Sequence, residues 1–414
     1  MNNFSGYVPR PFYIDRLRPL IGSPLIKVLL GQRGAGKTQI LYHLIREIKA
    51  GDKKAPVLYI DTEAPGYGHI KTGEELWRLV RTRLRGNRVN YVFIDEIQGI
   101  PGFERGLEAL SAGGRCDIYL AGSNARLVSG EFTAAFEGKY ARIQVYPLGY
   151  GEFLRFYRLN DTDKALETYL NAGGMPGLAF LPRNKLLIRG YLKNVYDSIL
   201  LRDVAAWEKI RHIRFLESIG ACLADTMGKV LSANTISGYL TSRGLRIPVQ
   251  TVINYLGALE KSFLVYSLRR FDPKEHKVFE TGEKYYFGDP GLRNVLCRHP
   301  PSPGDVQTVA YGVYLSLLRR GYTLFAGKTG EGEIGFAAEK PGEKFYVRPL
   351  GRLSGGTVPV RETAALEKIP DNFPKYAVFS EGPAASVSPR GIRLVPLREF
   401  LLTGGADSEP PGGP

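Results

Sequence analysis

The sequence predicts an α/β protein whose first domain is a doubly wound parallel sheet, and three observations lead to this fold class. A glycine-rich loop, residues 31–38, lies between an apolar run typical of a strand and a run with helical spacing. A second apolar run, residues 91–94, ends in two acids and is typical of a strand covered on both faces. Strand and helix patterns alternate over residues 25–147, which favours a parallel sheet flanked by helices.

The glycine-rich loop matches the pattern G-x-x-x-x-G-K-[ST] at every position. Glycines let the backbone bend and approach a polyphosphate while successive N–H groups point inward, and the positive end of the following helix adds to that field. We expect Lys37 to reach the β- and γ-phosphates of ATP and the Thr38 hydroxyl to bind Mg²⁺. The predicted nucleotide-binding residues are Gly31, Gln32, Arg33, Gly34, Ala35, Gly36, Lys37 and Thr38.

The acidic pair, Asp95 and Glu96, directly follows the strand predicted at 91–94. Ligands bind at the carboxyl ends of parallel strands, so we expect both acids beside the phosphates. Asp95 is predicted to hold Mg²⁺, directly or through water. Glu96 is predicted to polarise the attacking water as a general base.

A later strand, predicted at residues 117–122, closes on two polar residues, Ser123 and Asn124. In nucleotide-driven ATPases a polar side chain at this place senses the γ-phosphate, and Asn124 is the first candidate, with Ser123 second. The alternative role for Asn124 is structural, either within a turn or as the N-cap of a helix. Residues 141–146 alternate in polarity and are expected to form the last strand of the sheet. The predicted catalytic residues are therefore Glu96, Lys37 and Asn124.

Composition and charge restrict the class of protein. The 414 residues suffice for two or three domains, and the three cysteines lie far apart without metal-ligand spacing. No apolar run is long enough to cross a bilayer and residues 1–10 have no signal-peptide pattern, so we expect a cytoplasmic protein without a membrane partner. The net charge of +15 favours a polyanionic partner, nucleic acid above all, with a generally basic, Arg-rich surface as the alternative.

The periodicity divides the chain into five parts. Residues 1–150 form the predicted ATPase domain, and residues 151–210 are predicted to be a helical lid over the nucleotide. Residues 211–283 show short helices, a turn and a strand in the order of a winged helix-turn-helix. Residues 284–402 read as a mixed α/β domain, and residues 403–414 as a disordered Gly/Pro-rich tail.

The predicted winged helix leaves two roles open. Its second helix, at residues 249–256, has the position of a helix that enters the major groove, so residues 232–270 are candidates for DNA contact. Packing against a protein partner is the alternative. The residues expected near the bases are Gln250, Thr251, Asn254 and Tyr255, and those expected near phosphates are Arg243, Arg246, Lys261, Arg269 and Arg270.

These motifs carry a family resemblance over nearly all of residues 10–402. They are the loop at 31–38 and the segments 91–98, 122–124, 173–176, 201–204, 251–256 and 291–294, in this order. With them the chain resembles the archaeal and bacterial AAA-type ATPases that carry a winged helix and a C-terminal domain similar to the restriction-endonuclease fold. The resemblance implies a Mg²⁺-dependent ATPase that acts as a nucleotide-governed switch or motor, on DNA, on a protein partner or as a homo-oligomer. The alternative is an ATP-regulated DNA-binding protein with an inactive nuclease-like domain.

Two departures from the family pattern bear on activity. The nuclease fold binds Mg²⁺ through acids, but Ala310, Gly335 and Arg348 stand at the corresponding positions, which implies a degenerate site. Glu333 and Glu339 are candidate substitutes, and they keep a nuclease open as a third class.

The second departure concerns the arginine finger. Relatives tend to have Gly-Arg before the last strand of the sheet, whereas here Lys139 follows Gly138 and Arg142 stands three positions on. Lysine lacks the planar fork that spans two phosphate oxygens. Arg202 is an alternative lid sensor, unless it forms an ion pair with Asp203 or another acid. The sequence leaves open which of Lys139, Arg142 and Arg202 acts as finger or sensor.

Overall fold

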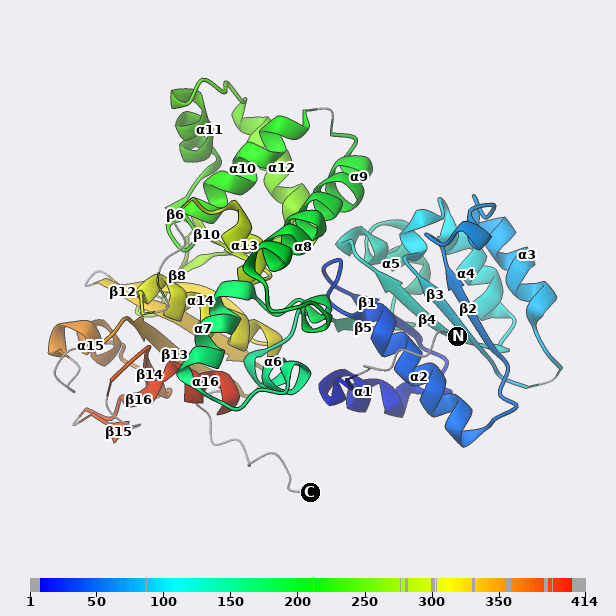
Figure 1. Ribbon diagram of the computed structural model, residues 1–414, viewed down its shortest axis with the longest axis horizontal. Helices are drawn as coiled ribbons and strands as arrows, with labels where there is room; N and C mark the ends of the chain where they lie inside the picture. Colours follow the sequence, from blue (N-terminus) through cyan, green and yellow to red (C-terminus); the bar gives the residue numbers. More distant parts are fainter. Residues whose placement is uncertain are drawn as a thin grey trace. The chain divides into compact units, whose positions relative to one another are not determined.

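The computed structural model describes residues 8–86, 88–210, 212–275, 277–279, 282–298, 302, 304–329, 332–353, 359–382, 386–388 and 390–403. The chain divides into two units (Figure 1). Unit 1 consists of Met1–Pro147 with Lys261–Phe263, and unit 2 of Leu148–Glu260 with Leu264–Pro414. Of the predicted disordered tail, Thr403 ends a helix, and residues 404–414 lie outside the described residues.

Unit 1 contains a five-stranded parallel sheet with the order β2-β3-β4-β1-β5. The strands predicted at residues 91–94, 117–122 and 141–146 are confirmed to within one or two residues at either end. The strands are β1 (Ile26–Leu30), β2 (Val57–Asp61), β3 (Asn90–Asp95), β4 (Cys116–Gly122) and β5 (Tyr140–Gln144).

Helices cover both faces of this sheet, so the central strands are buried throughout, as their unbroken apolar runs predict (Figure 1). Side chains of α1 (Pro11–Leu17) and α2 (Lys37–Gly51) share one core cluster with one face of the strands. On the opposite face lie α3 (Gly73–Arg83), α4 (Phe103–Ala112) and α5 (Glu131–Phe136). Short 3₁₀ turns connect them at Arg18–Leu20, Pro65–Tyr67, Ile97–Gly99 and Ala125–Val128.

A buried ion pair joins two neighbouring strands of the sheet. Lys27 on β1 and Asp117 on β4 are both buried, and 2.5 Å separates Nζ from Oδ1. Asp117 Oδ2 accepts further hydrogen bonds from the Tyr119 hydroxyl and the Gly22 amide. Because a buried charge without a partner is strongly destabilising, this pairing explains how a lysine is tolerated in an otherwise apolar strand.

Unit 2 begins with a helical segment, as predicted for residues 151–210. One helix of this segment ends at Ala172, and a 3₁₀ turn follows at Pro176–Phe180. The longest helix of the segment begins as an α-helix at Lys185 and continues as a π-helix, η6, from Ile199. The elements are α6 (Tyr150–Tyr157), α7 (Asp163–Ala172), η5 (Pro176–Phe180), α8 (Lys185–Ser198), η6 (Ile199–Ala205) and α9 (Ala206–Glu208). The role of this segment as a lid stays a prediction.

The next segment contains three helices and a small antiparallel sheet with the order β6-β10-β7. Its elements are α10 (Ile213–Asp225), β6 (Val230–Leu231), α11 (Ala233–Ser242), α12 (Val249–Lys261), β7 (Val265–Leu268) and β10 (Glu283–Phe287). The structure corrects one predicted boundary. β10 pairs with β6 and β7, so a division between residues 283 and 284 cuts through this sheet, because a strand pattern does not specify the strand's partner.

Tyr255 was predicted to lie near DNA bases, and this placement is wrong. Its side chain is buried with Val252 and Leu256 on the core face of α12. Gln250 and Asn254 are exposed, and the Gln250 amide donates to Asn254 Oδ1 over 3.1 Å. Gln250 and Asn254, and in part Thr251, are therefore accessible to a partner.

The last part of unit 2 is an eight-stranded mixed sheet with the order β15-β16-β14-β13-β12-β11-β8-β9. Its strands are β8 (Arg270–Asp272), β9 (Lys277–Val278), β11 (Thr323–Thr329), β12 (Gly332–Lys340), β13 (Glu343–Leu350), β14 (Lys375–Phe379), β15 (Ser386–Val387) and β16 (Arg393–Pro396). The accompanying helices are α13 (Pro290–Leu296), α14 (Val306–Arg319), α15 (Val360–Glu367) and α16 (Leu397–Thr403). The strands and helices of this part agree with the mixed α/β composition expected for residues 284–402.

Two glycine motifs that are far apart in the sequence meet inside unit 2. Asp289, the N-cap of α13, accepts hydrogen bonds from Gly174 N over 2.7 Å and from Leu292 N over 3.1 Å. Burial raises the pKa of Asp289 to about 6, and these amide donors oppose the rise. A Cβ added at Gly291 would lie 2.0 Å from Ala172 O. The motifs at 173–176 and 291–294 therefore form a close-packed junction.

We predict that Gly173→Ala destabilises unit 2 by about 2 kcal/mol. Gly173 has φ +84°, and a Cβ there would lie 2.2 Å from Asp289 Oδ1. Gly190→Ala is the matched control, because this helical glycine has no atom near its would-be Cβ. Thermal unfolding of both variants checks the prediction, and equal transition temperatures for the two would contradict it.

Candidate active site

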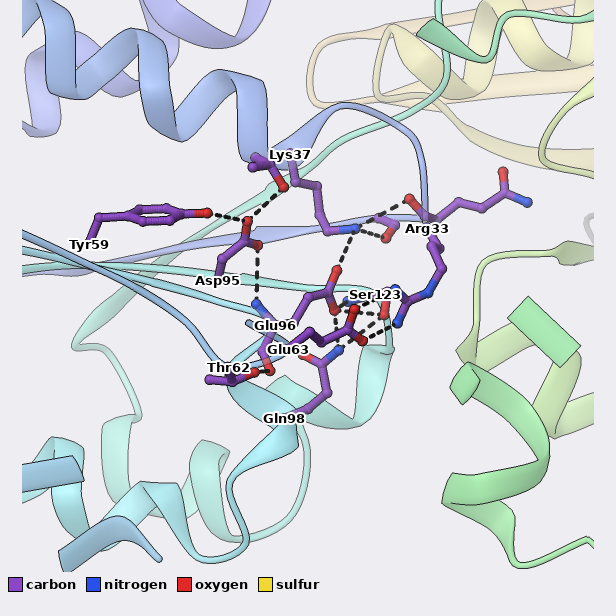
Figure 2. A network of polar contacts seen from close by, with 12 residues as sticks. Arg33, Lys37, Tyr59, Thr62, Glu63, Asp95, Glu96, Gln98 and Ser123 are labelled. Carbon is purple, nitrogen blue, oxygen red and sulfur yellow. Dashed lines mark hydrogen bonds and ion pairs between the residues drawn. The ribbon is translucent and has the colours of Figure 1, made fainter. Parts of the chain in front are cut away.

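The predicted site residues of unit 1 meet at one edge of the parallel sheet. The loop at 31–36 follows β1, Asp95 ends β3 with Glu96 directly after it, and Ser123 follows β4. Because β1, β3 and β4 are parallel, their carboxyl ends lie at the same edge. Figure 2 shows that Lys37, Asp95, Glu96 and Ser123 point toward one another there.

The loop takes a shape that requires glycine. A Cβ at Gly31 would lie 2.0 Å from Val145 O, so the backbone directly after β5 passes too close to leave room for a side chain at this position. Gly34 and Gly36 have φ values of +82° and +97°, in the left-handed region that glycine enters at little cost. The loop can therefore turn its backbone inward before α2 begins at Lys37.

The Lys37 ammonium lies inside this loop and is buried. Nζ donates to Gly31 O over 2.8 Å and to Gln32 O over 3.3 Å. It also lies 3.7 Å from Glu96 Oε1. The ammonium is thus placed between the loop and the acidic pair, where it can balance negative charge on either side.

Asp95 is held by two hydroxyl groups. Thr38 Oγ1 donates to Asp95 Oδ2 over 2.6 Å, and the Tyr59 hydroxyl donates to the same oxygen over 3.0 Å. Burial, followed by the charge of Glu96, raises the pKa of Asp95. Thr38 and Asp95, the two residues predicted to bind a metal, are therefore in direct contact.

Glu96 is fixed in an unusual backbone conformation, with φ 49° and ψ 42°. Its Oε2 accepts from Ser123 N over 3.2 Å, from Ser123 Oγ over 2.9 Å, and from Gln98 Nε2 (Figure 2). Burial alone would raise the pKa of Glu96, but the charges of Lys37 and Arg33 and these hydrogen bonds together lower it. The carboxylate is held ionised by its surroundings, in a strained geometry of the kind found at functional sites.

The two sensor candidates have different surroundings. Ser123 contacts Glu96 directly, whereas Asn124 is the N-cap of η4 (Ala125–Val128) and its Oδ1 accepts from Arg126 N over 2.9 Å. The structure thus gives Asn124 the capping contact that the sequence offered as its alternative. Its sensor role stays a prediction.

Three further residues of the site were missed by the sequence patterns. Gln98 donates to Ser123 Oγ as well as to Glu96, and Glu63 accepts two hydrogen bonds from Arg33 over 2.8 and 3.0 Å. Arg10 is buried and donates to Ala35 O in the loop and to Tyr146 O after β5. Of these three residues, only Gln98 lies inside a motif recognised in the sequence, the segment 91–98. The others act through contacts distant in sequence.

Lys139 and Arg142 are not brought to the loop of their own chain. Lys139 O accepts from Ile26 N at the amino end of β5, and Arg142 pairs in register with Val28 in the middle of β1. Both side chains are exposed. Arg202 lies exposed in η6 of unit 2. A finger or sensor role for any of the three stays a prediction.

The donor set fits Mg²⁺. The Thr38 hydroxyl and the Asp95 carboxylate are hard oxygen ligands already 2.6 Å apart. Within the described ranges, no group of three or more His, Cys, Asp or Glu side chains is placed to hold a metal. Mg²⁺ commonly takes one or two protein carboxylates and completes its shell with phosphate oxygens and water.

The positions of unit 2 that the family resemblance assigns to a nuclease site have other surroundings. Gly335 has φ +105°, and a Cβ there would lie 2.4 Å from Val347 O, so position 335 has no space for a carboxylate. Arg348 donates to Glu333 O and lies 3.4 Å from Glu362. Glu333 itself is 3.1 Å from the Lys284 ammonium. Both the likeness to the nuclease fold and the degenerate site stay predictions.

Comparisons with known proteins place the fold and site in a class. Residues 23–154 match the protein family described as "AAA domain", and residues 163–302 match a "Domain of unknown function (DUF8612)". Unit 1, with its parallel sheet and phosphate-binding loop, is therefore a P-loop domain of the AAA type.

Among the described residues, no helix combines the length and the apolar character needed to span a membrane.

One relative shows the family of the whole chain. An "Uncharacterized protein" of Haemophilus influenzae is 30% identical over 404 residues, which cover 95% of this chain and 98% of the relative. The chain belongs to the same family as this protein. An "Uncharacterized protein" of Methanocaldococcus jannaschii is 26% identical over 326 residues, 75% of this chain and 71% of that protein.

Two solved structures are similar at a lower level. A Walker-type ATPase of Pyrococcus abyssi has 18% identity and a TM-score of 0.47, with 70% of this chain and 96% of that chain covered. The ORC1 protein of Aeropyrum pernix in complex with DNA has 15% identity and a TM-score of 0.33, with 70% and 93% covered. At these TM-scores the likeness supports no conclusion about this chain.

We predict that Arg10→Leu lowers the stability of unit 1 by about 3 kcal/mol, because the buried Ala35 carbonyl and the partly buried Tyr146 carbonyl lose a charged donor. ATP affinity should fall as well, since Ala35 belongs to the loop. Arg16→Leu, an exposed arginine of the same helix α1, is the control and should change both quantities little. Thermal unfolding and an ATP titration check this; an Arg10 variant with the stability of the control would contradict it.

Proposed function

We propose that the chain binds ATP and Mg²⁺ at residues 31–38 and hydrolyses ATP, and that it acts as a nucleotide-governed switch or motor. The observation that carries the proposal is the convergence of Lys37, Thr38, Asp95 and Glu96 within hydrogen-bond or ion-pair distance at one edge of the sheet. One ammonium, one hydroxyl and two carboxylates are the groups that nucleotide hydrolysis requires.

Binding would use the loop backbone and Lys37. The ammonium now donates to two loop carbonyls, Gly31 O and Gln32 O, which hold it in place. Both polar atoms of the buried Gln32 amide lack a hydrogen-bond partner among the described residues. A buried polar group without a partner is costly, so this amide is a further candidate contact for phosphate or the ion.

The metal would be held by Thr38 and Asp95. When bound, Mg²⁺ supplies positive charge that offsets the charge developing on the phosphates. Asp95 brings a carboxylate into a buried position, and Thr38 and Tyr59 fix its orientation by donating to Oδ2. The chain therefore prepares this oxygen pair before any ion binds.

Glu96 is the general base in this proposal. Ser123 and Gln98 donate three hydrogen bonds to Oε2, which leaves Oε1, on the side of Lys37, as the oxygen that can accept a proton from water. The same donors stop the side chain from rotating. Ser123 and Gln98 thus act as positioning residues for the base.

We predict that Lys37→Ala abolishes measurable ATP binding, because charge-assisted hydrogen bonds to the phosphates are lost. Isothermal titration with ATP and Mg²⁺ checks the result. Lys164→Ala removes an exposed lysine of α7 in unit 2 and should bind ATP like the unmodified protein. Unchanged affinity in Lys37→Ala would reject the site.

We predict that Glu96→Gln binds ATP but hydrolyses it about 100-fold more slowly or worse, since an amide cannot accept the proton. Release of phosphate in steady state measures the effect, and Glu74→Gln on the exposed face of α3 is the control. Turnover at the unmodified rate in the Glu96 variant would remove this residue from its role.

A second candidate function is ATP-regulated DNA binding through residues 232–270. The order α10-β6-α11-α12-β7-β10 and the three-stranded sheet support a winged helix. α12 exposes Gln250 and Asn254, and Arg243 and Arg246 are exposed beside it. A DNA shift assay with Gln250→Ala plus Asn254→Ala tests this role, with and without ATP. If the double variant loses sequence preference, α12 contacts the bases. If its DNA binding is unchanged, packing against a protein partner is the better explanation of this segment.

A further inference from the structure

A basic hollow lies on unit 1 away from the loop that holds Lys37. Its volume is about 580 Å³, and it lies at the amino ends of β2 and β3. Because all strands of this sheet are parallel, that edge is opposite the edge that carries the loop and the acidic pair. The hollow is therefore separate from the candidate active site.

Five cationic side chains and no carboxylate line this hollow. Lys49, near the end of α2, donates to Ala55 O over 2.5 Å. The others are Lys53, Lys54, Arg83 and Arg85, all exposed, and the described part of the chain shows no ion pair for any of their side chains. The adjacent acid, Asp52, is used elsewhere, since Oδ1 accepts from Lys54 N and Oδ2 lies 3.5 Å from Arg88.

Helix ends explain only part of this charge. α2 ends at Gly51 and α3 ends at Arg83, and each carboxyl end presents about half a negative charge, which favours nearby cations. Two such ends amount to about one charge. Most of the positive charge of the five side chains therefore remains uncompensated at the hollow.

The nature of these groups indicates the class of ligand. A compact anion is usually held by fixed, buried donors, but four of these five side chains are exposed and come from two separate segments, 49–54 and 83–85. Long exposed cations suit a ligand that carries many phosphates along an extended chain. We propose that this hollow binds the phosphodiester backbone of nucleic acid without reading its sequence. The net charge of +15 adds to the attraction.

The test compares two triple variants of the full chain. Lys53→Gln, Arg83→Gln and Arg85→Gln together remove three charges from the hollow. The control, Lys164→Gln, Lys185→Gln and Arg189→Gln together, removes three exposed charges from α7 and α8 of unit 2. Binding of a fluorescein-labelled mixed-sequence duplex is followed by anisotropy between about 50 and 200 mM salt. ATP affinity and thermal unfolding of each variant are measured in parallel.

The expected result is that the hollow variant binds the duplex more weakly and that the slope of log K against log salt becomes shallower by about 2 to 3. The control should keep the slope of the unmodified protein, and both should keep its ATP affinity and unfolding temperature. A hollow variant with an unchanged slope would overturn the proposal. So would equal losses in both triple variants, or an unmodified protein without salt-dependent binding. The ATP titration distinguishes these outcomes from a failure of the nucleotide site.

Discussion

The ammonium of Lys37 is the charge on which the rest of the site depends. Two carboxylates, Asp95 and Glu96, lie side by side at the end of β3 with little exposure to solvent, and buried charges are costly without a partner. Lys37 lies 3.7 Å from one of them and is tied to the loop by two carbonyl groups. The single positive charge of Lys37 does not balance the two carboxylates of Asp95 and Glu96, so this arrangement favours the binding of a further cation.

The parallel sheet makes this arrangement possible. β1 and β3 each pair with β4 through parallel hydrogen bonding. The loop after β1 and the acids at the end of β3 therefore lie at the same edge of the sheet. The loop approaches β5 so closely that only glycine fits at position 31, and Arg10 ties the loop to the end of β5. The shape of the site is thus set by backbone contacts of unit 1.

Local motifs could be predicted from the sequence, and long-range contacts could not. The loop and the acidic pair were identified because their spacing is fixed within a few residues and because strand and helix patterns surround them. Arg10 and Glu63 were missed, since each meets its partner at least 25 residues away in the chain. Tyr255 was misplaced although the helical spacing of Val252, Tyr255, Leu256 and Leu259 indicates a buried face. The expected boundary between residues 283 and 284 falls inside the strand Glu283–Phe287, because the pattern of a strand does not specify which strands it pairs with.

The most direct measurement is the electron paramagnetic resonance signal of Mn²⁺, used in place of Mg²⁺ and titrated into the protein with ATP. If Thr38 and Asp95 form the ion site beside the loop, the unmodified protein holds Mn²⁺ tightly with ATP, and Asp95→Ala loses this binding while it keeps its fold. If Asp95→Ala holds Mn²⁺ and ATP as tightly as the unmodified protein does, the convergence of these residues is not a nucleotide site.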